Sequence, residues 1–516
     1  MAELTAKERF FCERVRALAL CNHFDETRLP LMRELLGDEY VDGGGRWHWQ
    51  WSSGETEDPN LERLCERTDA TLAAIHSRVT KQGEVLSTVK DAQLYQGLIW
   101  WVLYHRLRDE MLALVKAEQD TAKQVNCRKT YDRFSATYEK LLEIVDDQAE
   151  GRTPAAHLFA LFYQLRRAFF HIFYYMVGGS TVAGRLRSAV WESIFTHDRG
   201  RYMRSLYLRL GQVPTLITGE TGTGKELIAR AIACSRYIPY DESSGTFAAN
   251  YASSIHPLNL SALSQTLLES ELFGHRRGSF TGATADRVGY LEASGPLGTV
   301  FLDEIGELDV TLQVKLLRVL EDRRFNRIGD VESLPFEGKI IAATNRNLAD
   351  EIEEGAFRTD LYYRLCADQI RSPSLREQLQ ESPQELENAI LFIARREAGP
   401  EEAKQLTSET MAYVERELGL NYPWPGNFRE LGQCVRNVLV RNQYRPLRRR
   451  PRGAMTSMHE GIEDGSLTVA ELLRHYVSRI HAETDNYLET ARRLGIDHRT
   501  VRRHLDDDLI AEYRGA

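Results

Sequence analysis

The feature that most constrains the fold of this chain is the eight-residue stretch Gly219-Glu220-Thr221-Gly222-Thr223-Gly224-Lys225-Glu226. An apolar, β-branched run at 213–218 precedes it and a helix-forming run at 227–234 follows, so the sequence predicts a strand, a glycine turn and a helix. Successive backbone N–H groups in such a turn can surround a phosphate, and the helix N-terminus adds its positive dipole end. The stretch therefore predicts a phosphate-binding loop in a parallel α/β sheet, with Lys225 neutralising β- and γ-phosphate oxygens.

Two carboxylates follow a second buried strand. The run 299–302 is apolar or β-branched and delivers Asp303 and Glu304 to a strand end. Asp303 is suited to hold Mg²⁺ through water, and Glu304 to polarise an attacking water. The alternative is an acid pair that caps a strand-to-helix turn. A third apolar strand at 339–343 leads to Asn345, which is suited to orient the water or the γ-phosphate.

A glycine-flanked hexapeptide lies between the phosphate loop and the acidic strand. Its sequence is Gly278-Ser279-Phe280-Thr281-Gly282-Ala283. Taken alone, it would predict a flexible hairpin tip. An aromatic side chain exposed at such a tip is costly to leave in water, so we expect it to have a binding partner.

Composition indicates a reduced, cytoplasmic protein of several domains. The chain has 516 residues and a net charge of −9, so it is too long for one core and is not a generally basic nucleic-acid binder. Its seven cysteines are scattered without metal-ligand spacing. Neither a signal pattern nor an apolar run of the ~18 residues needed to span a bilayer is found, so no membrane association is expected.

The pattern of apolar and polar residues changes several times along the chain, which indicates several domains. The N-terminal part is mainly helical in pattern, with aromatic crowding at 159–175 that fits a helix-packing core better than a cofactor site, and Trp47–Trp51 alternates like a short strand. We expect an N-terminal regulatory domain of unknown type, an α/β ATPase subdomain, an α-helical lid, a basic flexible linker and an all-α C-terminal domain. Their predicted ranges are 1–183, 184–375, 376–445, 446–465 and 466–516.

The last fifty residues predict three short helices. Thr468 and Glu471 form a capping-box pattern, a second helix at 487–494 stops at Gly495, and a third begins after Asp497. This arrangement is typical of a helix-turn-helix whose basic third helix enters the major groove of DNA. An ordinary helical hairpin is the alternative. Residues 436–516 carry 15 Arg against 12 Asp and Glu, a local basic excess. The expected DNA-binding residues are His498, Arg499, Thr500, Arg502 and Arg503.

The centre of the chain, from about 201 to 431, resembles the AAA+ core of bacterial sigma-54-dependent transcription activators, also called enhancer-binding proteins. Seven blocks carry the resemblance in order, and the C-terminal end is similar to the Fis-type helix-turn-helix of that family. The blocks are GETGTGKE at 219–226, ESELFGHRRGSFTGA at 269–283, GTVFLDEIGELD at 298–309, LLRVLEDRRFNRIGD at 316–330, AATNRNL at 342–348, FRTDLYYRL at 357–365 and WPGNFREL at 424–431.

The resemblance implies roles for individual residues. It implies that Arg358 reaches the γ-phosphate bound by a neighbouring subunit, so that hydrolysis needs a hexameric or heptameric ring. Arg364 is a second candidate for this role, and a surface ion pair is its alternative. It implies that Arg429 senses the nucleotide from the lid, and that Asn259 holds or releases Glu304 according to the γ-phosphate state. It also implies that the 278–283 hexapeptide contacts sigma-54, and that ATP and Mg²⁺ are the cofactors.

Three departures from the family pattern stand out. The hexapeptide has Ser279 where the family usually has alanine, which keeps the aromatic and the threonine. The segment 238–257 is longer and more polar than its family counterpart, so it is either a surface loop or a contact with the N-terminal domain. Residues 1–183 carry no sensor pattern that we can identify, so the signal or partner that they receive is unknown.

Taken together, the sequence predicts an ATP-hydrolysing activator that binds upstream double-stranded DNA and remodels the closed complex of RNA polymerase and sigma-54. Two other functions compete with this one. One is a DNA-binding regulator with a degenerate ATPase, which the presence of Phe280, Thr281, Glu304 and Arg358 disfavours. The other is an AAA+ remodeller of unrelated substrates, which the terminal helix-turn-helix disfavours.

Overall fold

The structure of the chain is a computed structural model that describes residues 2–42, 59–121, 123–146, 152–382, 384–446 and 467–506, with positions 458, 462, 509–511 and 513. The predicted Trp47–Trp51 strand and most of the predicted 446–465 linker lie outside these residues. The chain divides into two compact units, Met1–Asn442 and Gln443–Ala516, and each is described by itself. No helix within the described ranges is both long and apolar enough to span a bilayer.

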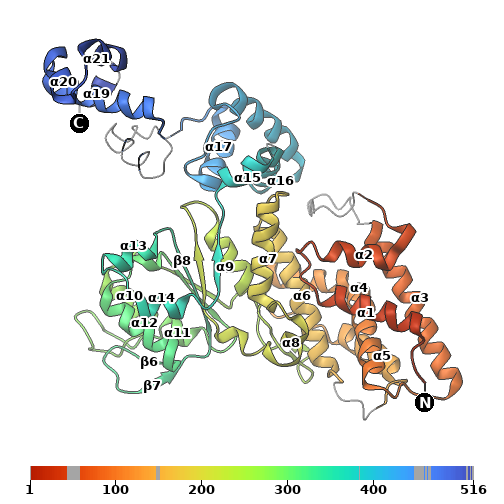
Figure 1. The fold of residues 1–516 in the computed structure, drawn as a ribbon. Helices are drawn as coiled ribbons and strands as arrows, with labels where there is room; N and C mark the ends of the chain where they lie inside the picture. The colour runs from red at the N-terminus through yellow and green to blue at the C-terminus, as the bar shows by residue number, and fades with distance from the viewer. Residues whose placement is uncertain are drawn as a thin grey trace. The chain divides into compact units, whose positions relative to one another are not determined.

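The N-terminal part of the first unit is a bundle of helices (Figure 1). Two long helices, α4 and α6, form its centre, and the residues that recur at helical spacing on α4, such as Leu98 and Trp101, are buried. A complete capping box at Thr5 fixes the start of α1. The elements are α1 (Ala6–Leu20), α2 (Arg28–Leu36), η1 (Gly37–Glu39), α3 (Pro59–Gln82), α4 (Val89–Thr121), α5 (Arg128–Leu142) and α6 (Ala155–Tyr175).

A five-stranded sheet lies at the centre of the first unit, and every neighbouring pair of its strands is parallel. The order is β4-β5-β8-β1-β9, which confirms the predicted parallel α/β core. The three strands predicted from apolar runs are adjacent in it as β5, β8 and β1. The bounds are β1 (Thr215–Thr218), β4 (Ile255–Asn259), β5 (Thr299–Asp303), β8 (Lys339–Thr344) and β9 (Gln369–Arg371).

Alternate residues of these strands enter two different cores, as the period of two in a strand requires. Ile217 and Ile341 join a core that continues into the N-terminal helices, whereas Leu216 and Ile340 join a second core on the other face. The elements around the sheet are α7 (Thr181–Phe195), α8 (Arg199–Arg201), η2 (Tyr202–Leu206), η3 (Leu210–Gln212), α9 (Lys225–Ala233), α10 (Gln265–Phe273), α11 (Tyr290–Ala293), η4 (Ile305–Glu307), α12 (Val310–Asp322), α13 (Leu348–Glu353) and α14 (Thr359–Leu365). The hairpins β2 (Tyr240–Asp241) with β3 (Thr246–Phe247) and β6 (Arg324–Asn326) with β7 (Ser333–Pro335) complete this part.

A helical lid follows β9, as predicted. It consists of α15 (Leu375–Glu381), α16 (Gln384–Tyr413), η5 (Val414–Leu418) and α17 (Asn427–Arg441). Gly399, at φ 82°, interrupts the helical backbone of α16 just before Pro400, where a ring and a missing N–H would break a helix in any case.

The 238–257 segment is a contact with the N-terminal helices rather than a free surface loop. Its Phe247 ring stacks on Tyr163 of α6 at 3.9 Å, and the Tyr251 hydroxyl donates to the Val115 carbonyl of α4 at 2.7 Å. Both rings are buried. Of the two alternatives that the sequence left open, the structure therefore supports the second.

The expected division at residue 183 does not coincide with a gap in the first unit. Helix α6 packs directly against α9, the helix that follows the phosphate loop. From α6, the buried Arg167 donates to the carbonyls of Cys234 at 2.9 Å and Arg236 at 2.7 Å. The N-terminal helices and the α/β core therefore share one continuous packing interface.

The second unit contains the three short helices expected near the C-terminus. They are α19 (Val469–Thr484), α20 (Tyr487–Leu494) and α21 (His498–His504). The Thr468 capping box and the Asp497 N-cap are both formed. A small core of Val477, Ala491 and Val501 holds the helices together.

Candidate functional site

The phosphate loop connects β1 to α9 and lies against the lid. A side chain at Gly222, which has φ 82°, would place its Cβ 2.2 Å from the Gly426 carbonyl oxygen, so this close approach requires glycine. Asn427 of the lid donates from Nδ2 to the carboxylate of Glu220 and to the carbonyl of Thr221, each at 3.1 Å. The loop and the lid are thus directly hydrogen-bonded.

Lys225 is buried at the start of α9 and turns back over the loop. Its ammonium donates to the carbonyls of Gly219 at 2.9 Å and Glu220 at 3.2 Å. Burial lowers its pKa, and the negative charges of Glu304 and Asp303 oppose that effect. A buried ammonium held by two carbonyls and near two carboxylates is well placed to bind anionic phosphate oxygens instead.

The structure brings the two predicted carboxylates and Asn345 together at the carboxyl ends of neighbouring strands. Glu304 follows β5 with φ 59° and ψ 52°, a left-handed conformation that is uncommon for a residue with a side chain. Its carboxylate accepts the backbone N–H of Asn345 at 3.2 Å. The Asn345 amide donates to the Thr221 hydroxyl at 2.7 Å. Burial, followed by the neighbouring Glu304 charge, raises the pKa of Asp303.

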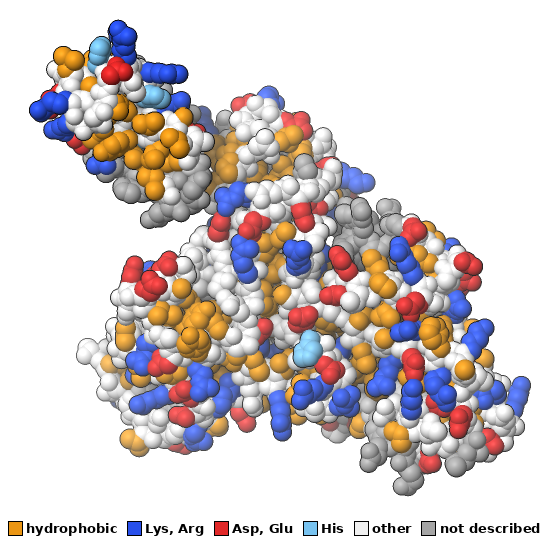
Figure 2. Space-filling model, viewed as in Figure 1, with side chains coloured by type: hydrophobic (Ala, Val, Ile, Leu, Met, Phe, Trp, Pro, Cys, Tyr) orange, Lys and Arg blue, Asp and Glu red, His pale blue; other side chains and the backbone are white. Residues whose placement is uncertain are grey.

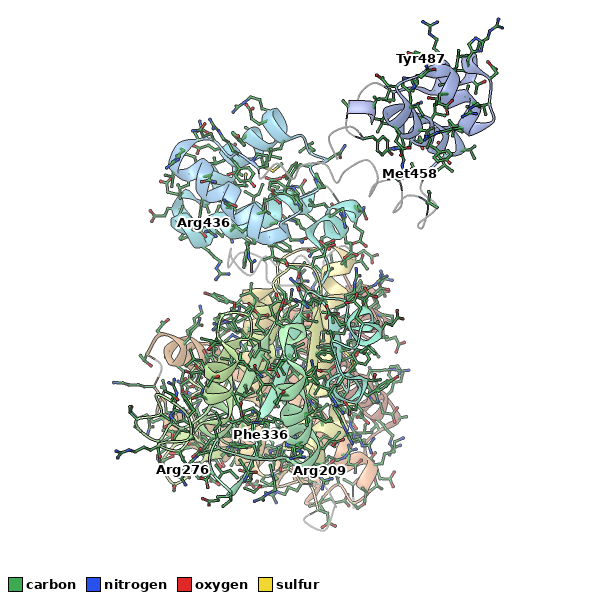
Figure 3. The ribbon with its side chains drawn as sticks, turned by 90° about the vertical axis from the view of Figure 1, so that its left-hand side faces the viewer. Arg209, Arg276, Phe336, Arg436, Met458 and Tyr487 are labelled. Atoms are coloured by element: carbon green, nitrogen blue, oxygen red, sulfur yellow. The ribbon has the colours of Figure 1, made fainter. Side chains whose placement is uncertain are left out.

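A cavity of about 520 Å³ lies over the phosphate loop and the two carboxylates. The phosphate loop, Asp303 and Glu304 form one side, and the lid forms the other with Arg429, which was predicted to face the nucleotide. Several lining residues were not predicted from the sequence: Tyr175, Met176, Val177, Leu186, Phe392, Arg396 and Arg436. The apolar run before Gly178 was the available signal for the first three, but helix packing explained it equally well. Figure 3 labels Arg436 on the lid.

Asn259 lies beside the site without contacting Glu304. It ends β4 in register with Asp303 of β5. Its side-chain oxygen accepts the backbone N–H of Ser261 at 2.9 Å and the Ser261 hydroxyl at 2.8 Å. Among the described residues, Glu304 is hydrogen-bonded to the Asn345 backbone and not to Asn259. The implied Asn259–Glu304 contact is therefore not made in this state.

The two predicted arginine fingers do not line the cavity of their own chain. Arg358 is the N-cap of α14, and its guanidinium pairs with Asp360 at 3.0 and 2.6 Å. Arg364 pairs with Glu321 of α12 at 3.0 Å. Both side chains are exposed, so they are accessible to another molecule.

The 278–283 hexapeptide is a tight turn, and its aromatic ring is less exposed than predicted. The Gly278 N–H donates to the Ala283 carbonyl at 2.8 Å, and the Ala283 N–H donates to the Phe280 carbonyl at 3.0 Å. Phe280 is half-buried, with its ring centroid 4.9 Å from that of His275 in an edge-to-face contact. The ring expected to be exposed is only half-exposed, because this histidine at the base of the turn covers one edge. Thr281 remains exposed.

The base of the turn is fixed by ion pairs. Arg276 pairs with Asp286 at 2.9 Å and with Asp330 at 2.7 Å. The Ser279 side chain lies against Gly329, where a Cβ would come within 2.6 Å of the serine Cβ. A rigid base and an exposed threonine suit the turn for contact with another protein.

The basic residues of α21 lie on its outer face. His498, Arg499, Arg502 and Arg503 are exposed while Val501 is buried in the small core. Thr500 is half-buried, and its hydroxyl donates to the Asp497 cap at 3.1 Å. Blue and pale-blue side chains project from the C-terminal unit in Figure 2. This is the charge distribution expected of a recognition helix.

Comparison with known proteins identifies the central domain. A family model described as "Sigma-54 interaction domain" matches residues 201–371. Transcriptional regulatory protein ZraR of Escherichia coli (strain K12) is 37% identical over 295 residues, which are 56% of this chain and 62% of that protein. DNA-binding transcriptional regulator NtrC of the same strain is 41% identical over 241 residues, 47% of this chain and 46% of that protein.

A third relative, the Nif-specific regulatory protein of Azotobacter vinelandii, is 42% identical over 228 residues, 44% of this chain and 40% of that protein. The chain thus spans less than two thirds of the length of these curated relatives. The match nevertheless covers the phosphate loop, the acidic strand, the hexapeptide and the two arginines predicted to be fingers. Residues 201–371 of this chain are therefore similar to sigma-54 interaction domains.

Proposed function

We propose that the chain is an ATP-hydrolysing transcription activator, which binds DNA upstream of a promoter and remodels the closed complex of RNA polymerase and sigma-54. The observation that carries the proposal is the convergence of Lys225, Asp303 and Glu304 on one cavity, with Asn345 hydrogen-bonded to Glu304. The matched domain also presents the 278–283 hexapeptide.

The carboxyl ends of β1, β5 and β8 provide the groups that ATP hydrolysis needs. The backbone N–H groups of the loop and Lys225 bind the phosphates, and Glu304 polarises the attacking water. Asn345 fixes the Glu304 carboxylate through its backbone N–H, which favours a single orientation of this general base. The half-buried carboxylate of Asp303, with its raised pKa, fits a site for Mg²⁺ held through water. When bound, Mg²⁺ would neutralise charge on the phosphates.

The other wall of the cavity suits the remainder of the nucleotide. Tyr175, Met176 and Leu186 provide an apolar surface for the base. Arg429 of the lid lies over the loop, where its guanidinium can bind the γ-phosphate when ATP is present. Because Asn427 links the loop to the lid, a change in the phosphates is transmitted to the lid helices.

Complete catalysis requires a second copy of the chain in a ring. Arg358 is exposed and lies outside the cavity of its own chain, so it serves the γ-phosphate of a neighbouring copy, with Arg364 beside it on α14. An arginine finger provided by another subunit raises related phosphoryl-transfer rates by about 10³–10⁵. The ion pair with Asp360 holds the Arg358 side chain in place until a γ-phosphate of a neighbouring copy replaces the carboxylate.

A short path leads from the cavity to the hexapeptide. Asn259 ends β4 next to Asp303, and α10 then runs to the base of the turn. When the γ-phosphate changes the hydrogen bonds of Glu304, Asn259 is near enough to respond, and α10 would carry that movement to Thr281. The basic face of α21 meanwhile anchors the protein in the major groove of upstream DNA.

The experiment that tests the proposal substitutes the general base. Glu304→Gln keeps the size of the side chain and removes its basicity, so ATP turnover should fall by about 10²–10⁴ while ATP binding persists. Phosphate release, binding of a fluorescent ATP analogue and transcription from a sigma-54 promoter are measured together. Glu353→Gln, an exposed change at the end of α13, is the matched control. Transcription by Glu304→Gln at the parent rate would refute the proposal.

A further inference from the structure

A second cavity lies near the opposite end of the same sheet. Its volume is about 190 Å³, and it is bounded by the amino end of β8, the end of α9 and the 202–212 segment. In Figure 3, Arg209 of that segment and Arg436 of the lid lie at opposite ends of the first unit. The two cavities share no lining residue.

Two cations form the inner part of this cavity. Lys339 is only 2% exposed, and its ammonium donates to the Val213 carbonyl at 2.7 Å. Arg236 donates to the carbonyls of Pro296, at 3.0 Å, and Gly298. A Cβ at Gly211 would come within 2.4 Å of the guanidinium, so a larger residue there would displace this side chain. A buried ammonium and a half-buried guanidinium therefore both line this cavity.

Within the described residues, the Lys339 ammonium forms no ion pair, although it can donate three hydrogen bonds. Asp368 is near enough to raise its pKa, but that carboxylate accepts from the hydroxyls of Ser193 at 2.5 Å and Thr215 at 2.8 Å. Burial dominates and lowers the pKa of Lys339 to about 7. A buried ammonium without a carboxylate partner is costly, so an anion entering the cavity would be strongly favoured.

The side walls are aromatic and aliphatic. Tyr202, Tyr207 and Tyr237 line the cavity with Ile194 and Leu297. His157 of α6 fixes two of the rings: its Nδ1 accepts from the Tyr237 hydroxyl at 2.7 Å, and its own ring lies 4.2 Å from that of Tyr207. Tyr202 begins a π-helical turn, a backbone form that is frequent at functional sites. The volume compares with ~150 Å³ for a protein cavity that holds benzene.

The mouth of the cavity is accessible. Leu208 and Glu337 both line the cavity; Leu208 is 60% exposed, and Glu337 is exposed as well. A small molecule can therefore reach Lys339 without unfolding the segment around it.

We propose that this cavity binds a small organic carboxylate with one apolar ring, whose carboxylate is held by Lys339 and Arg236 and whose ring lies among the three tyrosines. The ligand touches α9, which carries Lys225 at its other end. It also touches β8, whose other end lies just before Asn345. It also touches residues held by α6 of the N-terminal helices. The site is thus an effector site, from which ligand binding can affect the nucleotide cavity through α9 and β8.

The first test is calorimetric titration of the full chain with phenylacetate, in the presence of saturating ADP so that the nucleotide cavity is occupied. Acetate lacks the ring and benzyl alcohol lacks the charge. We expect saturable binding of phenylacetate, with each of the other two binding at least about tenfold more weakly. Benzyl alcohol loses the charge-assisted hydrogen bonds and acetate loses the burial of the ring, and each loss is worth at least that factor. Equal binding of benzyl alcohol, or no binding of phenylacetate, would overturn the proposal.

Two sets of variants locate the site. Lys339→Met should weaken phenylacetate binding at least about tenfold, whereas Lys404→Met, an exposed change on α16, should leave it unchanged. Because Lys339→Met could disturb folding, the exposed mouth provides an independent pair. Leu208→Asp should weaken binding and Leu208→Lys should retain or strengthen it. Unchanged affinity in a folded Lys339→Met protein, or equal affinity in the two Leu208 variants, would contradict the site.

Discussion

The two ends of the central sheet differ in how their residues come together. At the carboxyl ends, consecutive residues of two short motifs, the phosphate loop and Asp303-Glu304, line the large cavity, and Asn345 of a third motif is hydrogen-bonded to Glu304. At the other end, the small cavity is made by single residues that are far apart in the chain, such as Tyr202, Arg236 and Lys339. The first kind of site is visible in a sequence, whereas the second exists only after folding.

The comparison also separates two kinds of buried charge. Lys225 is surrounded by loop carbonyls and lies near two carboxylates, and a bound phosphate completes its coordination. Within the described residues, Lys339 donates to a carbonyl and forms no ion pair. Arg167 donates to two carbonyls and lies over the rings of Tyr163 and Tyr251. Helix α9 lies between these environments, so it links the nucleotide site to the N-terminal helices.

The largest expected effect is a loss of ATP hydrolysis at the carboxyl ends of the sheet. Arg358→Ala should lower ATP hydrolysis by about 10³ or more, because the finger acts on a neighbouring copy. Lys225→Ala should also be inactive, because it cannot bind the phosphates. Mixing the two proteins should restore part of the rate, since each Lys225→Ala copy still provides its finger to an intact site. Phosphate release from mixtures of varied ratio measures this, and no recovery at any ratio would show that Arg358 acts within its own chain.

A smaller effect tests the other end of α9. Arg167→Met leaves the carbonyls of Cys234 and Arg236 without their donor, so the free energy of unfolding should fall by about 2–4 kcal/mol. Thermal denaturation followed by circular dichroism measures the change. The matched control is Arg185→Met on the exposed side of α7, which should stay within about 0.5 kcal/mol of the parent. Equal melting temperatures for the two variants would break the assignment of α6 as a structural partner of α9.

The smallest effect is a pH dependence at the second cavity. The pKa of Lys339 is lowered to about 7 in the folded chain from the usual 10.5, so between these values the unfolded chain binds more protons and stability rises with pH. Asp368 opposes this shift while Arg236 and Arg323 add to it. From about pH 7 to pH 9 the parent should gain up to about 3 kcal/mol relative to Lys339→Met. A constant difference in melting temperature between the two proteins would contradict an uncompensated charge at Lys339.

Sequence reasoning predicted the parallel core, the lid and the C-terminal helices because each depends on local patterns. The strand ends carry Asp303 and Asn345 in the same runs that form the strands, so the positions of these residues could be predicted together. The half-burial of Phe280 could not be predicted, because its partner His275 has no sequence signature. The same holds for the 238–257 segment, whose Phe247 and Tyr251 look like loop aromatics until α4 and α6 are in place.

The N-terminal helices show the limit most clearly. Their periodicity predicted helices, but it did not predict which helix faces would pack against the α/β core. Arg167 belongs to no sequence motif, so its contact with the end of α9 could not be predicted either. Tyr175 and Met176 belong by sequence to an apolar helix end, yet they line the nucleotide cavity because α6 and α7 meet there. A residue at a junction of elements acquires its role from the packing of both.

The most direct test of the central claim uses Thr281 at the exposed tip of the hexapeptide. Thr281→Ala and Thr284→Ala remove the same atoms from exposed positions that are three residues apart. ATP hydrolysis and open-complex formation by RNA polymerase with sigma-54 are measured on one promoter. We predict that both variants hydrolyse ATP like the parent, and that only Thr281→Ala fails to open the promoter. Normal opening by Thr281→Ala would show that hydrolysis does not act through this loop.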